Sequence, residues 1–135
     1  MREQNVTIDG VPVTLIKMSA APGFKMLARL TRILGGSLMD AAASAGKSKE
    51  EQATAFGDVI DGIVAKTTDD QLYNLINDTL CGGFVAVGGK KLTHLDDLGA
   101  IEDSDPFYLG LMIFKEQMIF SFGPAIKKLM GAQTS

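Results

Sequence analysis

The stretch DPFYLGLMIFKEQMIFSF, residues 105–122, decides how the rest of the chain is interpreted. Asp105-Pro106 predicts a helix start, because proline is favoured at the first helical position, where its missing N–H costs nothing. The residues that follow are apolar on nearly every side of a helix, apart from Lys115-Glu116-Gln117. A helix that is apolar all round is buried in a large core, spans a membrane or waits for a partner. A chain of 135 residues offers no large core, so we expect a partner.

The sequence of this segment also predicts where its helix ends and whether it crosses a membrane. We expect its helix to run to about Phe122, to break at Gly123-Pro124 and to resume for one or two turns over residues 125–130. A membrane-spanning helix needs about 20 consecutive apolar residues. Charges at Lys115 and Glu116 interrupt the run well before that length, so we predict no membrane insertion.

Two β-hairpins are predicted, each from a short turn between β-rich runs. Asp9-Gly10 lies between two such runs, and this dipeptide is a strong hairpin signal because both turn positions need positive φ. Pro12 cannot donate a hydrogen bond, which places its strand at a sheet edge there. Gly88-Gly89 predicts a second, smaller hairpin over residues 84–93.

Between the hairpins the apolar spacing becomes helical. Phe24, Leu27, Leu30, Leu34 and Leu38 form one stripe, and Gly35-Gly36 is expected to bend or split that helix. Ser48-Lys49-Glu50-Glu51 and Thr68-Asp69-Asp70-Gln71 are capping-box patterns that open two further helices. Because the link between these two helices is very short, we expect them to pack as an antiparallel pair.

The predicted fold is therefore mainly α, of the α+β class, in a single domain spanning residues 1–135. It comprises a β-hairpin over residues 1–18, a helical core over 22–82, the small hairpin over 84–93 and apolar C-terminal helices over 105–131. The formal charge is −3, which excludes the overall basic character typical of nucleic-acid binding. One cysteine excludes an internal disulfide, and the polar N-terminus does not resemble a signal peptide.

Residues able to carry chemistry are scattered, and we predict no catalytic, cofactor-binding or metal site. His94 is the single histidine and lacks convergent partners, while Cys81 fits a small buried side chain. We expect residues 94–104 to form an acidic connection, and the carboxylates of this segment and of Asp105 lack the alternation and turn glycine of a calcium loop. Residues 88–91, GGKK, do not match phosphate-loop spacing. Lys25, Arg29 and Arg32 share one helix face, which fits a solvated surface better than an acidic partner.

The chain contains seven methionines and seven phenylalanines, which catalytic or metal chemistry does not explain. Most of them fit a core, but methionine repacks easily around different partners, so the C-terminal helix is a candidate for an adaptable binding surface. The predicted partner-binding residues are Phe107, Leu111, Phe114, Met118, Phe120 and Phe122.

The order of elements resembles the tail assembly chaperones of tailed bacteriophages. The matching features are a strand pair with a turn glycine and a Pro-containing, Leu-rich helix from Pro22 to Gly35. A helix opened by Thr68-Asp69 and a glycine-containing hairpin over residues 84–92 come next. An acidic-aromatic entry at residues 103–107 then leads to an aromatic-rich helix that closes with Phe120-Ser121-Phe122. The resemblance covers most of the chain.

That resemblance implies a non-enzymatic protein without cofactors that binds apolar helices of the tape measure protein in the host cytoplasm. Such a protein keeps its client soluble, helps to recruit tail tube subunits and is absent from the mature virion. Self-association is also compatible with the sequence. Two alternatives remain open: a tail-completion or baseplate component retained in the virion, and a small module that binds and regulates a host protein.

Overall fold

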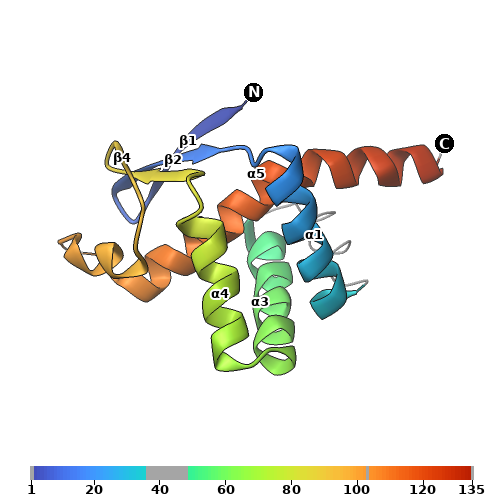
Figure 1. Cartoon of the computed structure of the whole chain (residues 1–135). Coiled ribbons are helices and arrows are strands. Elements are labelled where there is room, and N and C mark those ends of the chain that lie inside the picture. The colour runs from blue at the N-terminus through green and yellow to red at the C-terminus, as the bar shows by residue number, and fades with distance from the viewer. Residues whose placement is uncertain (1, 36–48, 103, 135) are drawn as a thin grey trace.

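The computed structural model describes residues 2–35, 49–102 and 104–134. In these ranges a four-stranded antiparallel sheet and three α-helices lie around the first part of a fourth, long C-terminal helix (Figure 1). In chain order the elements are β1 (Glu3–Ile8), β2 (Val11–Ile16), α1 (Ala20–Leu34), α3 (Lys49–Lys66), α4 (Asp69–Leu80), β3 (Val85–Val87), β4 (Lys90–Lys91), the 3₁₀ helix η2 (Leu95–Ala100) and α5 (Pro106–Thr134). The predicted class, mainly helical with two β-hairpins and an apolar C-terminal helix, is confirmed.

Both predicted hairpins form, and they join into one sheet in the order β1-β2-β3-β4. Asp9 and Gly10 have φ values of 52° and 77°, the positive values that a tight two-residue turn requires. Pairing of Val13 with Val87 and of Leu15 with Val85 connects the two hairpins. Alternation along β2 buries Val13 and Leu15 on one face, so this face covers the core.

The prediction that Pro12 marks a sheet edge is wrong. β2 lies between β1 and β3, so it is an inner strand of the sheet. Pro12 nevertheless lies just beyond the last residue pair of β2 with β3, where its carbonyl oxygen accepts a hydrogen bond from the Gly88 amide at 2.9 Å. The missing N–H therefore falls at the end of a ladder, which an inner strand tolerates.

Helix α1 buries only part of the predicted stripe, namely Leu30 and Leu34. Its buried residues are Gly23, Met26, Leu30 and Leu34, whereas Phe24 is 72% exposed. Gly23 is small enough for the Phe122 ring to approach, with a ring carbon 3.8 Å from where a Cβ would lie. The helix ends before Gly35, whose positive φ of 56° suits glycine. Leu38 and Gly36 lie outside the described residues.

The capping box predicted at the start of α4 is confirmed. The Thr68 hydroxyl oxygen accepts a hydrogen bond from the Gln71 amide at 3.2 Å, and the Gln71 side-chain oxygen accepts from the Thr68 amide at 3.0 Å. Helix α3 begins at Lys49, as expected, but Ser48 of the other predicted box lies outside the described residues.

Only part of the predicted α3–α4 pairing is present. The chain reverses direction between the two helices through Thr67-Thr68 (Figure 1). However, α3 packs chiefly on α1, and α4 packs chiefly on α5. Close approach explains this choice, since a Leu34 methyl carbon lies 3.1 Å from the position of a Cβ on Gly62 of α3. An apolar stripe predicts that a helix packs against something, but it does not predict which element is its partner.

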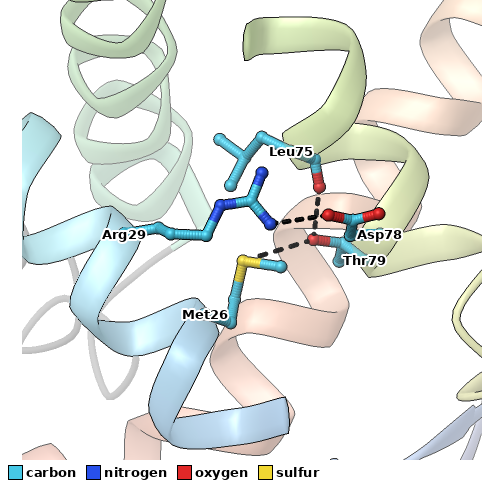
Figure 2. Close-up of polar contacts among 5 residues, drawn as sticks. All are labelled: Met26, Arg29, Leu75, Asp78 and Thr79. Carbon is cyan, nitrogen blue, oxygen red and sulfur yellow. Dashed lines mark hydrogen bonds and ion pairs between the residues drawn. The ribbon is translucent and has the colours of Figure 1, made fainter.

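Polar contacts also join α1 to α4 (Figure 2). The Arg29 guanidinium lies 2.7 Å from a carboxylate oxygen of Asp78. Beneath this ion pair, the buried Thr79 hydroxyl donates to the Leu75 carbonyl oxygen at 2.8 Å and lies 3.7 Å from the sulfur of Met26. The basic face expected on α1 is thus partly neutralised by the chain itself.

Helix α5 starts as predicted but does not break. The Asp105 side chain accepts hydrogen bonds from the amides of Phe107, at 2.9 Å, and Tyr108, at 3.4 Å. The helix then continues to Thr134 with Pro124 inside it, so the break predicted at Gly123-Pro124 is wrong. Proline costs about 3 kcal/mol inside a helix. Extending an existing helix needs no new nucleus, and burial of Phe122 and Gly123 holds the preceding turn in place.

The middle of α5 is buried and attaches to the opposite end of the chain. Gln117 is fully buried, and its side-chain nitrogen donates to the Ile16 carbonyl oxygen at 2.8 Å. One turn later, the Ser121 hydroxyl accepts a hydrogen bond from the Met18 amide at 3.3 Å. These contacts satisfy two backbone groups, the Ile16 carbonyl at the end of β2 and the Met18 amide in the connection to α1.

Removing the α4 cap should lower stability modestly. We expect Thr68→Ala to reduce the free energy of unfolding by about 1 kcal/mol, because the Gln71 amide loses its acceptor. Urea denaturation followed by circular dichroism measures this change. Asp70→Ala, in the same helical turn but outside the hydrogen-bond pair, serves as the control, and an equal loss in both variants would contradict a specific role for the cap.

Truncating Gln117 should have a larger effect. Gln117→Ala leaves a cavity and strands the Ile16 carbonyl, so we expect a loss of about 2–3 kcal/mol. The neighbouring Glu116→Ala, which removes a partly exposed side chain, should lose less than about 0.5 kcal/mol. The idea that this hydrogen bond attaches α5 to the β2–α1 connection would not survive if both variants unfolded at the same urea concentration.

Candidate functional site

An apolar groove lies where α4, η2 and the first turns of α5 meet. Its volume is about 480 Å³. The lining residues are Tyr73, Ile76, Leu95, Asp96, Leu98, Gly99, Pro106, Phe107, Gly110 and Leu111. All but Asp96 are apolar, aromatic or glycine. Helix α5 packs on both α4 and η2, so the elements that form the groove are in direct contact.

The helical spacing of α5 divides its first turns between the groove and the core. Phe107 and Leu111 are four residues apart and share one side of the helix, where they are 81% and 40% exposed. Leu109 and Ile113 lie on the opposite side and are fully buried. The Asp105 cap fixes where the helix begins, and it therefore fixes which residues face the groove.

Helix η2 forms the second wall. The Asp97 carboxylate accepts hydrogen bonds from the Thr93 hydroxyl and the His94 amide, both at 3.3 Å, and this closes the turn that starts η2. Leu98 is buried and lies against α5, with a methyl carbon 3.3 Å from the position of a Cβ on Gly110. Glycine at this point lets η2 and α5 approach closely enough to share the groove.

The exposed rings beside the groove make it an unusual surface for a small protein. Phe107 and Leu111 are among the exposed large apolar side chains, and Tyr73 and Tyr108 are each at least half exposed. Clustered apolar exposure of this kind marks a protein, membrane or ligand interaction site. No helix in the described parts of the chain is long and apolar enough to cross a membrane.

The six predicted partner-binding residues are not all on the surface. Phe107 and Leu111 line the groove, and Met118 and Phe120 are half-buried. Phe114 is 1% exposed and Phe122 is buried, so both rings belong to the core in this structure. Phe114 and Phe122 are therefore not accessible to a partner in this structure, because the sheet and the other helices cover this part of α5. The binding role of these residues stays a prediction.

Sequence reasoning missed the groove residues that come from α4 and η2. Tyr73 lies off the apolar stripe of α4, and an aromatic residue off the stripe was the available signal. Leu95 and Leu98 lie in a segment interpreted as an acidic connection, which η2 corrects. Nothing local in these residues shows that they meet Phe107, since the contact joins segments that lie apart in the chain.

The remaining candidates do not form a catalytic cluster. His94 is exposed, and Gly88 and Gly89 have positive φ values of 61° and 83°, as the hairpin turn requires. Within residues 2–35, 49–102 and 104–134, no group of three or more His, Cys, Asp or Glu side chains could hold a metal ion. Burial raises the pKa of the Cys81 thiol, and the negative charge of Asp97 raises this pKa further.

These features define a small α+β protein with an apolar groove among its described residues. A profile of the family described as phage tail assembly chaperone protein, TAC, matches residues 9–133. The match spans almost the whole chain, so the chain belongs to this family and has a general role in tail assembly as a chaperone. No curated protein and no solved structure matched the chain.

The raised pKa of Cys81 predicts slow alkylation. Because the thiolate is the reactive form, iodoacetamide should modify native Cys81 more slowly at pH 8 than it modifies free cysteine. Asp97→Asn removes the negative charge and should increase the rate, while Asp61→Asn on α3 should leave it unchanged. Mass spectrometry over time gives the rates, and alkylation of the native chain as fast as that of free cysteine would contradict the prediction.

Proposed function

We propose that this protein uses its groove to bind apolar helices of the tape measure protein in the host cytoplasm. It thereby keeps that client soluble until the tail forms, helps to recruit tail tube subunits and is absent from the mature virion. The protein acts by binding alone and catalyses no reaction. The observation that carries the proposal is the exposed groove between α4, η2 and α5, bordered by Phe107.

The shape and chemistry of the groove suit a helix. An amphipathic helix places anchors at i, i+3 or i+4 and i+7 into an apolar groove on its partner. Phe107 and Leu111 present two anchors at the same spacing on α5, and Tyr73 and Ile76 supply apolar surface from α4. Burying apolar surface contributes about 25 cal/mol per Å². Covering an exposed helix stripe of the client therefore lowers its tendency to aggregate.

Family membership supports the same proposal. A tail assembly chaperone must bind a protein of the tail, and the family resemblance implies the tape measure protein, whose long helices expose apolar stripes. A folded protein with an apolar groove can bind such stripes and cover one client segment at a time. Retention in the virion is the alternative outcome, which mass spectrometry of finished particles would reveal.

Single substitutions in the groove should separate client binding from folding. We expect Phe107→Ser to weaken binding of a tape measure fragment by about 2 kcal/mol, which is the typical loss for an aromatic anchor. Leu111→Ser should weaken it less, because this side chain is partly covered already. Co-expression with the fragment, followed by gel filtration, measures co-elution and client solubility.

The matched control is Phe24→Ser, which removes another exposed phenylalanine, on α1 outside the groove. This variant should keep full client binding. Loss of binding in Phe24→Ser but not in Phe107→Ser would move the binding surface away from the groove. Failure of the unchanged chain to co-elute with the fragment or to increase its solubility would reject the proposed function.

A further inference from the structure

The apolar groove lies beside an acidic hollow. This second hollow has a volume of about 400 Å³ and is lined by Tyr73, His94, Leu95, Asp96 and Asp97. Tyr73, Leu95 and Asp96 also line the groove, so the two hollows are adjacent and share one wall. A ligand lying along the groove would therefore pass from an apolar wall to a pair of carboxylates.

The side chains that line the groove and the hollow carry negative charge only, from Asp96 and Asp97. No lysine or arginine lines the groove or the hollow. Asp97 is occupied in part by the Thr93 hydroxyl and the His94 amide. Asp96 is exposed, and it makes no hydrogen bond or ion pair to the described residues. Its charge is consequently available to a partner.

We propose that the occupant of the groove is an amphipathic helix with a lysine or arginine just beyond one end of its apolar stripe. The stripe lies against Phe107 and Leu111, and the cation lies in the hollow near Asp96. This inference rests on the proposed function, and it adds a chemical criterion by which one helical segment of the client is preferred over another.

Helix α1 of a second copy fits the groove less well than an amphipathic client helix does. Helix α1 carries the exposed Phe24 next to Lys25, which is the combination of ring and cation that the groove requires. However, the apolar stripe of α1 is buried in its own core at Met26, Leu30 and Leu34. It offers a single ring, whereas an amphipathic helix offers several anchors along the groove.

Charge should tune the choice of segment more than it drives binding. An ion pair that remains open to solvent changes affinity by about two- to fivefold, and it weakens as salt is added. The apolar contacts supply the rest of the affinity, and added salt does not screen them. The cation therefore separates helices that carry similar apolar stripes.

Three synthetic helical peptides test the inference against the full chain. They share one leucine stripe and differ only in whether lysine, glutamine or glutamate follows it. Fluorescence anisotropy measures each dissociation constant at low and at high salt. We expect the lysine peptide to bind about two- to fivefold more tightly than the glutamine peptide, with the glutamate peptide weakest and the differences lost at high salt.

Two variants of the chain locate the effect. Asp96→Asn should bring the three affinities together while leaving the affinity for the glutamine peptide unchanged. Asp61→Asn is an equally conservative change at an exposed residue of α3 that does not line the groove, and it should preserve the order of the three affinities. Phe107→Ser should weaken all three peptides by a similar factor.

The possible failures are distinguishable. Equal binding of the three peptides, lost in Phe107→Ser, would overturn the charge criterion while leaving the proposed function intact. Absence of peptide binding by a chain that still co-elutes with the tape measure fragment would also overturn it. Self-association that is lost in both Phe24→Ser and Phe107→Ser would assign the groove to a second copy instead.

Discussion

Burial of α5 through the middle of the molecule is the constraint on which the other elements depend. Leu109, Ile113 and Phe114 are almost completely inaccessible, and each such side chain contributes about 1.5–3 kcal/mol when it leaves water. The sheet and α4 pack on this helix, and Gln117 and Ser121 hold the connection between β2 and α1. The C-terminal segment thus completes a core that begins with the first strands.

The same helix explains why the groove is stable while carrying exposed rings. Its inner side is anchored in the core, so its outer side can present Phe107 and Leu111 without collapsing onto the body. A rigid apolar surface loses little conformational entropy when a client binds. Under the function proposed above, the protein does not need to unfold in order to expose the groove.

Local signals account for the parts of the structure that were predicted well. The hairpin turn at Asp9-Gly10, the Thr68–Gln71 capping box and the Asp105 cap each depend on residues within four positions of one another. Family resemblance was visible because it follows the order of these local elements. The candidate site was predicted only in part, since Phe107 and Leu111 come from one helix whereas Tyr73 and Leu98 come from two other elements.

Turns, caps and apolar periodicity were readable in the chain because short-range geometry imposes them whatever the surroundings. The partners of each element were not, because packing depends on which surfaces fit once the chain is compact. Tertiary structure made β2 an inner strand despite Pro12, left Phe24 in solvent, carried α5 past Pro124 and buried Phe114. It also divided the apolar first turns of α5 into a core side and a groove side, because burial is a property of contacts between distant segments and not of the residues alone.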